Sequence, residues 1–226
     1  MKRNIAVLFG GQSSEHEISV ISAQTVIRNM DPEMFSPILI GITKEGHWVL
    51  VKDIAQIADG SWKESPLHAV LSPDATEKCL YVFEGEKAEK IPVDVAFPVL
   101  HGKWGEDGTV QGLFELAQIP YVGCGLLASA VSMDNYYTKQ IVSGIGIAQA
   151  KYVIFFAADV KRMDAKVAEV EEKLGYPAFI KPCNAGSSCG VSKATNEEEL
   201  RAGIFTALQH DREVLIEEMI VGREIE

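Results

Sequence analysis

The sequence predicts an α/β fold, with a doubly wound amino-terminal domain and a smaller α/β domain after it. Apolar runs of strand length alternate with stretches of helical period, as in βα units around a largely parallel sheet. Two glycine-rich polar loops, at residues 10–17 and 100–109, each follow a strand and precede a helix. The pattern changes after Gly123, and 226 residues with 47% hydrophobic side chains suffice for two small domains.

In the amino-terminal part, four apolar runs predict strands. They cover residues 5–9, 38–42, 95–100 and 121–122. Two further pairs of runs, 40–42 with 48–51 and 80–83 with 90–93, flank short turns that contain Gly46 and Gly85. Such pairs are typical of hairpins, so an antiparallel edge of the sheet is expected.

After Gly123 the pattern predicts a second set of helices and strands. The expected order is a helix over residues 126–144, a strand over 152–155, a helix over 163–174, a strand over 178–181, a strand around Val191, a helix over 197–209 and a strand over 214–217. We expect domains at residues 1–123 and 124–216, with a third beginning at 217–226. Because residues 222–226 resemble the middle of a strand, we expect the sequence to be a fragment whose carboxy-terminal domain is truncated.

Charge and composition disfavour several classes of protein. The formal net charge of -11 provides no general attraction to nucleic acid or to an anionic membrane surface. No stretch has the roughly 18 to 20 apolar residues that a membrane span needs. The cysteines are scattered without metal-ligand spacing, and we expect free thiols in a reducing cytoplasm. They are Cys79, Cys124, Cys183 and Cys189.

The first glycine-rich loop is a candidate binding loop. Gly10 and Gly11 permit backbone angles and a close ligand approach that a side chain would prevent. Ser14 and Glu17 have the spacing of a capping box, which predicts the start of a helix. Glu15 has two interpretations: favourable charge at the helix N-terminus, or a carboxylate that holds a substrate ammonium group.

The second glycine-rich loop follows the strand at residues 95–100 and contains His101 and Gly102. It lies at the same expected edge of the sheet as the first loop, and two such loops define a cleft. An ordinary turn with a structural histidine is the alternative. Convergence with Glu15 favours a role for His101 in a site.

Two later segments predict nucleotide binding. Lys181 leaves a strand and enters a loop rich in glycine and serine, where a cation and loop N–H groups suit a triphosphate. The motif is not a Walker A sequence, and a plain hairpin loop is the alternative. The apolar run at residues 214–220 contains Glu217 and Glu218, which could offer backbone groups to an adenine and a carboxylate to a ribose. A strand end solvated by charges explains it equally well.

Taken together, these segments resemble the ATP-grasp ligases of the D-alanine:D-alanine family. The most specific motif is residues 97–102 with 105–109, followed by Gly10-Gly11 with residues 13–17. The resemblance extends to four shorter motifs, at residues 133–134, 181–182, 186–188 and 222–224. It implies an ATP-grasp subdomain over residues 124–216. It also implies a cytoplasmic, homodimeric enzyme of peptidoglycan precursor synthesis that uses ATP and Mg²⁺.

The resemblance also implies roles for individual residues. In this family ATP phosphorylates the carboxylate of one D-alanine, and the amino group of a second attacks the acyl phosphate. Glu15 and Ser187 would be the catalytic residues, the first on the substrate ammonium and the second beside the second substrate. His101 and Gly102 would lie near the first substrate's carboxylate. The residues implied to bind ATP are Lys181, Glu217, Glu218, Ile220 and Glu224.

The sequence departs from the family at one nucleotide-binding position. The family usually has lysine after residues 133–134, where this chain has Asn135. Lys139 lies one helical turn further on, on a similar face, and is a candidate replacement. The family's magnesium-binding acids and transition-state arginine are expected beyond residue 226, so no metal ligand is named here.

Other functions are compatible with parts of the pattern. A D-alanine:D-serine ligase of the vancomycin-resistance kind is the nearest alternative. A non-catalytic module that binds substrate or nucleotide is an alternative of another class. A dinucleotide oxidoreductase is disfavoured because its glycine spacing is missing. We expect the 226-residue piece alone to be inactive as a ligase.

Overall fold

The computed structural model describes residues 2–223 and residue 225. The chain divides into two compact units, Met1–Ala130 (unit 1) and Val131–Glu226 (unit 2). Each unit has its own sheet and its own hydrophobic core. The two units are therefore described one after the other.

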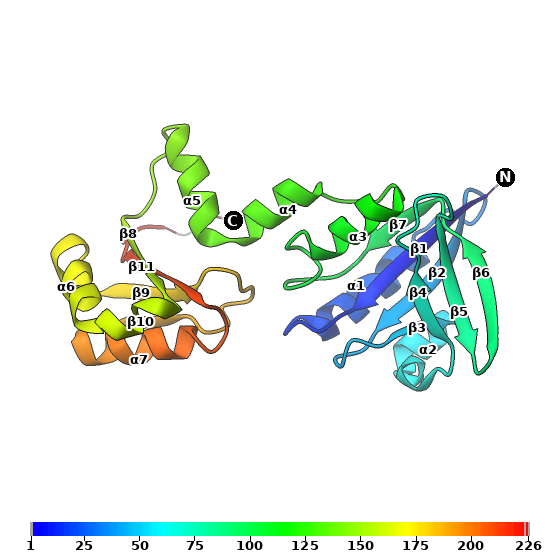
Figure 1. Ribbon diagram of the computed structural model, residues 1–226, viewed down its shortest axis with the longest axis horizontal. Helices are drawn as coiled ribbons and strands as arrows, with labels where there is room; N and C mark the ends of the chain where they lie inside the picture. The colour runs from blue at the N-terminus through cyan, green and yellow to red at the C-terminus, as the bar shows by residue number, and fades with distance from the viewer. Residues whose placement is uncertain (1, 224, 226) are drawn as a thin grey trace. The chain divides into compact units, whose positions relative to one another are not determined.

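Unit 1 contains a seven-stranded mixed sheet in the order β6-β5-β4-β3-β2-β1-β7 (Figure 1). The strands are β1 Arg3–Gly10, β2 Phe35–Ile42, β3 Trp48–Val51, β4 His68–Leu71, β5 Cys79–Glu84, β6 Lys87–Pro92 and β7 Val95–Pro98. β1 is parallel to β2 and β7, whereas β2 to β6 pair antiparallel. Both predicted hairpins and the antiparallel edge are confirmed. The run at residues 121–122 forms only one bridge, from Tyr121 to Ala96.

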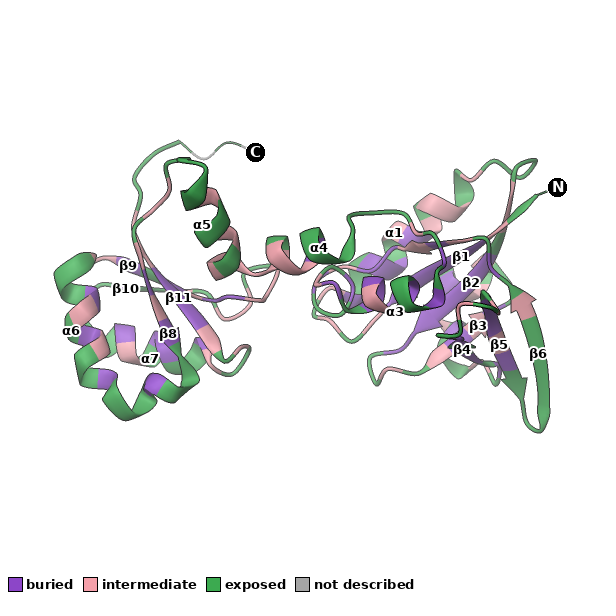
Figure 2. Cartoon of the chain, turned by 45° about the horizontal axis from the view of Figure 1, so that its top comes forward, coloured by how far each residue is buried: buried purple, intermediate pink, exposed green. Residues whose placement is uncertain are grey.

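Helices cover both faces of this sheet, which confirms the doubly wound arrangement. They are α1 His16–Arg28, α2 Ile54–Asp59, the 3-10 helix η1 Ser61–Glu64 and α3 Thr109–Ala117. A further helix, α4 Leu126–Met133, follows α3 and crosses the boundary between the two units. Alternate side chains of β1 point to opposite faces. Ala6 and Leu8 pack in the core on the α3 side, and Val7 and Phe9 pack in the core with α1 and η1. Figure 2 shows β1 and β2 as the buried centre of the unit.

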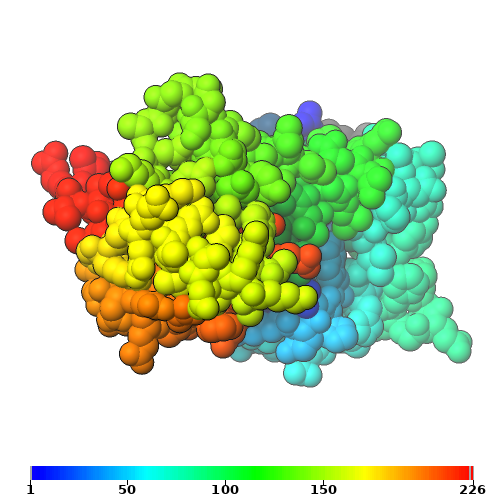
Figure 3. Space-filling model, turned by 60° about the vertical axis from the view of Figure 1, so that its left-hand side comes forward, coloured from blue at the N-terminus to red at the C-terminus, as the bar shows by residue number. Residues whose placement is uncertain are grey.

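Unit 2 contains a four-stranded antiparallel sheet in the order β10-β9-β11-β8. Its elements are α5 Asn135–Gly144, β8 Tyr152–Phe156, the 3-10 helix η2 Ala157–Arg162, α6 Met163–Lys173, β9 Ala178–Pro182, β10 Ser192–Ala194, α7 Glu197–Ala207 and β11 Glu213–Glu218. α6 and α7 pack on one face through Val170 and Ile204, and they form neighbouring ridges of the surface (Figure 3). The opposite face carries longer polar side chains at the ends of β9 and β11.

Two local predictions were wrong. The helix predicted over residues 126–144 is broken, because α4 ends at Met133 and Asp134 adopts an extended conformation. The Asp134 carboxylate accepts hydrogen bonds from the N–H groups of Tyr136 and Tyr137, so it starts a new helix. The capping box at Ser14 is also absent, since α1 begins at His16 with Glu15 as its N-cap residue.

No helix in the described part of the chain is long and apolar enough to cross a membrane.

Candidate functional site

The first and second glycine-rich loops are hydrogen-bonded to each other in unit 1. They leave β1 and β7, which are adjacent parallel strands, so both loops lie at one edge of the sheet. The Ser13 hydroxyl donates to the carbonyl oxygen of His101 at 2.7 Å and accepts from the N–H of Glu15 at 3.1 Å. One serine side chain therefore sets the spacing between the two loops.

Glu15, His101 and Gly102 lie together at this junction. A Cβ atom on Gly102 would lie 2.4 Å from Oε2 of Glu15, so the carboxylate packs directly against the glycine backbone. Gly102 also has a φ of 69°, in the region that favours glycine. The His101 ring forms a hydrogen bond of 3.1 Å through Nε2 with the hydroxyl of Ser22 on α1. The structure thus brings together the three residues that the sequence predicts for the first substrate.

Buried polar contacts beneath the loops hold them in place. The hydroxyl of Ser19 on α1 accepts from the N–H of Gly10 at 2.8 Å and donates to the carbonyl oxygen of Val99. The His16 ring donates through Nδ1 to the carbonyl oxygen of Gly11 at 2.7 Å, and His16 is almost fully buried. Sequence reasoning missed these roles of Ser13, Ser19 and His16, because they depend on the packing of α1 against β1 and β7.

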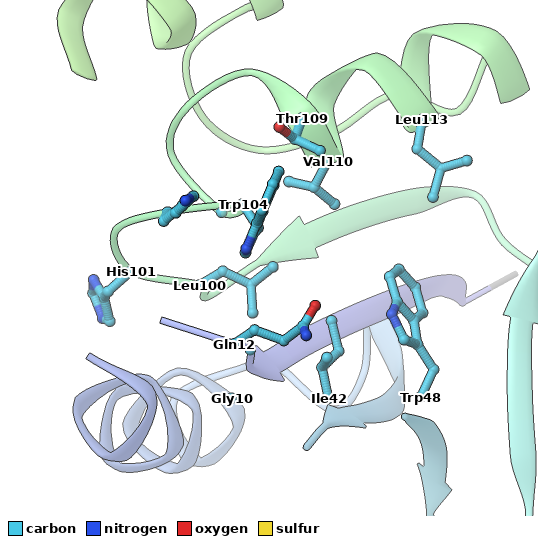
Figure 4. Close-up of a pocket in the computed structure, with 13 residues that line it drawn as sticks. Gly10, Gln12, Ile42, Trp48, Leu100, His101, Trp104, Thr109, Val110 and Leu113 are labelled. Carbon is cyan, nitrogen blue, oxygen red and sulfur yellow. The ribbon is translucent and has the colours of Figure 1, made fainter. Parts of the chain in front are cut away.

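A pocket opens on the α3 side of the second loop, at the edge where the sequence predicts a cleft (Figure 4). Its volume is about 250 Å³. Trp104, Leu100 and Val110 line it together with Trp48 of β3. In Figure 4 the His101 ring lies beside α1, away from the middle of the pocket.

In unit 2, Glu217 forms ion pairs with two lysines from different elements. Its Oε1 lies 2.6 Å from Nζ of Lys139 on α5, and its Oε2 lies 2.5 Å from Nζ of Lys181 on β9. β9 and β11 are antiparallel, with Lys181 opposite Leu215 and Glu217 opposite Phe179. Lys181 and Glu217 are therefore diagonal neighbours on the same face, within reach of long side chains.

This lysine cluster, formed by Lys139, Lys181 and Glu217, is largely removed from solvent. The side chains of Lys139, Glu217 and Lys181 are 11%, 13% and 27% exposed. The Lys139 ammonium also donates to the carbonyl oxygen of Ala150 at 3.1 Å and lies 5.1 Å from the centre of the Tyr152 ring.

Two opposing effects act on the pKa of Glu217. Burial alone would raise this pKa, and it is the largest single effect. The hydrogen bonds from Lys139 and Lys181 and the charges of both lysines together outweigh burial, so the pKa of Glu217 lies below its ordinary value. Glu217 is therefore ionised at neutral pH, and the cluster has a net charge of +1 from two ammonium groups and one carboxylate.

The other nucleotide candidates lie near this cluster in sequence but differ in their contacts. The Glu218 carboxylate accepts from the N–H of Lys151 at 2.7 Å, which ties β11 to the start of β8. Ile220 follows the end of β11 and is 66% exposed. Glu224 lies outside the described residues.

Ser187 belongs to the loop between β9 and β10. It has a φ of 49°, and the next residue, Ser188, has a φ of 56°. Two consecutive serines with left-handed backbone are uncommon, because a Cβ atom disfavours this region. Such conformations often occur at functional loops.

Asn135 does not take part in the lysine cluster. Its side-chain amide and its backbone N–H both donate to the carbonyl oxygen of Cys183 at 2.9 Å. It therefore joins the start of α5 to the end of β9. Lys139 lies one turn further along α5 and is the lysine of this helix that meets Glu217.

Within residues 2–223 and residue 225, no three His, Cys, Asp or Glu side chains are grouped so that they could hold a metal ion. We assign no described residue to a metal ion.

Two models that describe the two ends of one class of ligase match the chain. Residues 4–124 match the family model described as D-ala D-ala ligase N-terminus, and residues 141–226 match the model described as D-ala D-ala ligase C-terminus. The chain therefore belongs to the D-alanine–D-alanine ligase family.

Individual relatives cover the whole of the chain. It is 45% identical over 226 residues to a D-alanine–D-alanine ligase of Caldicellulosiruptor bescii and 47% identical over 242 aligned positions to that of Acetivibrio thermocellus. All of this chain is aligned in both cases, but it spans only 62% and 64% of the length of these relatives.

Solved structures of two relatives have the same fold. The VanG D-Ala:D-Ser ligase from Enterococcus faecalis is 42% identical with a TM-score of 0.89, and the match covers 98% of this chain and 64% of the VanG chain. The D-alanine-D-alanine ligase from Coxiella burnetii is 29% identical with a TM-score of 0.86, and the match covers 98% of this chain and 65% of the Coxiella chain.

Proposed function

We propose that these residues are part of an ATP-dependent ligase that joins two D-alanines through an acyl phosphate. Unit 1 binds the first D-alanine, and unit 2 binds the nucleotide. The product, D-alanyl-D-alanine, is a precursor of peptidoglycan, and the enzyme acts in the cytoplasm as a homodimer. The domains that we propose are residues 1–123, 124–216 and the beginning of a third at 217–226.

The lysine cluster of unit 2 is the observation that supports nucleotide binding best. Two ammonium groups on one face of a sheet present donors that suit phosphate oxygens. Glu217 keeps both lysines extended toward the same point, so little side-chain entropy remains to be lost when a phosphate arrives. Lys139 thereby takes the place of the lysine that the family usually has at the position of Asn135. The backbone after Glu217, with Glu218 and Ile220, would meet the adenine, and Glu224 the ribose.

The loop junction of unit 1 supports a site for an amino acid. The Glu15 carboxylate would hold the ammonium group of the first D-alanine, with the backbone of Gly102 beside it. His101, oriented by Ser22, would lie near the substrate carboxylate. Ser187 would order the second substrate.

Magnesium would supply charge stabilisation between the phosphates during phosphoryl transfer. No group of three His, Cys, Asp or Glu side chains within the described residues could hold the ion, so none of them is assigned to it.

A D-alanine:D-serine ligase is the second candidate, because the VanG ligase matches this chain with 42% identity and a TM-score of 0.89. Product analysis separates the two. The complete ligase that contains these residues is supplied with ATP, D-alanine and D-serine, and the dipeptides are resolved by chromatography. D-alanyl-D-serine as the main product would favour the alternative.

Substitution of the two lysines tests nucleotide binding. Lys139→Met and Lys181→Met each remove a charge while keeping the apolar stem. A lost charge-assisted contact to phosphate is worth about 1.5 to 3 kcal/mol, so each should lower kcat/KM for ATP roughly ten- to a hundredfold.

Lys173→Met on α6 is the matched control, because Lys173 pairs with Glu169 and not with Glu217. It should leave ATP kinetics unchanged. If Lys181→Met leaves ATP kinetics unchanged as well, Lys181 does not bind phosphate. If only Lys139→Met is harmless, Lys139 has not replaced the missing lysine.

A further inference from the structure

Most residues that line the pocket on the α3 side of the second loop have no role in the proposed ligation. The pocket lies entirely within unit 1, between the ends of β1 and β2, the strand β3, the second loop and the first turns of α3. Glu15 and Gly102 do not line it. His101 borders both the pocket and the junction that we assign to D-alanine, and the pocket continues from there toward Trp48.

Two indole rings border this pocket. Trp48 rises from β3 at one end, and Trp104 of the second loop points into it at the other, with Leu100 and Val110 between them (Figure 4). Within the described residues neither ring packs on another aromatic side chain, whereas the buried Trp62 contacts Phe9 and His16. The aromatic walls are thus available to a planar ligand.

Trp104 has a backbone conformation that is unfavourable for a bulky side chain. Its φ is 69°, a left-handed conformation that is rare for a bulky residue, and its side chain remains 46% exposed. The Asp107 carboxylate accepts from the N–H of Trp104 at 2.8 Å and stabilises this turn. Strained residues are common where a protein clamps a ligand, and burial of the exposed indole by a ligand would offset the strain.

The polar groups around the pocket indicate which functional group a planar ligand would carry beside its ring. The Gln12 amide and the Thr109 hydroxyl make no hydrogen bond within the described part of the chain, and both line the pocket. The Lys103 ammonium lies 5.0 Å from the centre of the Trp104 ring. No carboxylate lines the pocket, although the chain as a whole has a charge of -11. This lining favours an anionic group over a cationic one.

We propose that this pocket is a binding site for a small aromatic carboxylate. The aromatic ring lies between Trp48 and Trp104, and the carboxylate faces Lys103 and the Gln12 amide. The volume of about 250 Å³ suits a ligand of one or two rings.

The test uses the indole N–H signals of the ¹⁵N-labelled 226-residue chain, which contains three tryptophans. Benzoate is the probe. Its addition should shift the signals of Trp48 and Trp104 with a saturating dependence on concentration and leave that of Trp62 in place. Cyclohexanecarboxylate keeps the charge without the flat ring, and benzyl alcohol keeps the ring without the charge. Each should bind at least fivefold more weakly.

Two variants and a control separate binding from folding. Trp104→Gly removes the indole and relieves the left-handed strain, so the chain should fold while benzoate affinity falls at least tenfold. Lys103→Met should reduce benzoate affinity to that of benzyl alcohol. Leu116→Ala, at a residue of α3 that is 67% exposed and outside the pocket, should change nothing.

Three results would overturn the proposal. They are a linear, non-saturating shift, an equal shift of the Trp62 signal, and unchanged affinity in folded Trp104→Gly.

Discussion

At the scale of single residues, each carboxylate oxygen of Glu217 forms an ion pair with the ammonium group of a different lysine. Both lysines depend on it, because removal of the carboxylate would leave two like charges close together and largely desolvated. Its position at the end of β11 also explains how Lys139 and Lys181, which come from different elements, reach one point. Glu217 thus positions the two cations that we assign to phosphate binding.

Glu217→Gln should destabilise unit 2 in a way that depends on pH. The pKa of Glu217 is lower in the folded chain than its ordinary value of 4.5, so the ionised form stabilises the fold. This stabilisation is complete above about pH 4.5 and is lost as the pH falls through the lowered pKa. At pH 7 the variant should lose roughly 1 to 3 kcal/mol.

Thermal unfolding of the native chain and of Glu217→Gln, followed from pH 7 to pH 3, measures this effect. The difference between them should shrink as the pH falls. Glu172→Gln, at an exposed glutamate of α6, serves as the control. A difference that stays constant over this range would show that the carboxylate charge is not what holds the cluster.

Glu15→Gln should reduce use of the first D-alanine severely in the complete ligase and change stability little. Glu15 is the N-cap residue of α1, but its side chain makes no capping hydrogen bond. Loss of a charge at a helix N-terminus costs only about 0.3 to 1 kcal/mol. Steady-state kinetics with D-alanine and a melting curve distinguish the two roles. A sharp fall in Tm with normal kinetics would support the purely structural role.

At the scale of elements, the break between α4 and α5 places Lys139 beside Glu217. Asp134 ends one helix and caps the next, so α5 starts its own register at Asn135. Asn135 is then held by the Cys183 carbonyl oxygen, and Lys139 faces Glu217. A continuous helix over residues 126–144 would lack the N-cap at Asp134 that starts α5.

Gly41→Ala should weaken the packing of η1 on the sheet. Gly41 lies in β2, and a Cβ atom there would be 2.3 Å from Cε3 of the Trp62 ring, which is fully buried. Overpacking of this kind costs about 1 to 3 kcal/mol, which should appear as a lower Tm of unit 1.

Gly144→Ala is the control for this substitution. It lies at the end of α5, and a Cβ atom would meet nothing within 4 Å. It should leave stability unchanged or raise it by up to about 1 kcal/mol through helix propensity. If both variants melt alike, the contact between Gly41 and Trp62 is not tight.

At the scale of the whole molecule, the 226-residue chain should bind ATP but form no dipeptide. All three residues of the lysine cluster lie within unit 2, whereas the described residues contain no group of three His, Cys, Asp or Glu side chains that could hold a metal ion. ATP at a hundred times its Kd should stabilise the folded state by about 2.7 kcal/mol. Calorimetric melting with and without ATP, together with chromatography for dipeptide, measures both. Dipeptide formation by this chain alone would contradict the prediction.

The sequence by itself determined the parts of the protein that depend on local pattern. Continuous apolar runs of strand length predicted β1 and β2, and a glycine between two short runs predicted both hairpins, because strand and turn preferences act over a few residues. The glycine-rich loops could be located from their place directly after a strand, and Lys181 was singled out because its strand leads into a loop rich in glycine and serine. The family resemblance rests on these same motifs, and the family assignment was confirmed.

Tertiary structure alone decided which distant residues meet. Lys139 and Glu217 are far apart in sequence and form a pair only because α5 packs beside an antiparallel sheet whose register places Glu217 diagonal to Lys181. Ser13 and Ser19 hold the loops only because β1 and β7 are neighbours. The break at Asp134 and the left-handed backbone of Trp104 likewise depend on packing. Local sequence preference fixes the elements, but contacts between elements depend on register and on side-chain volume across the whole core.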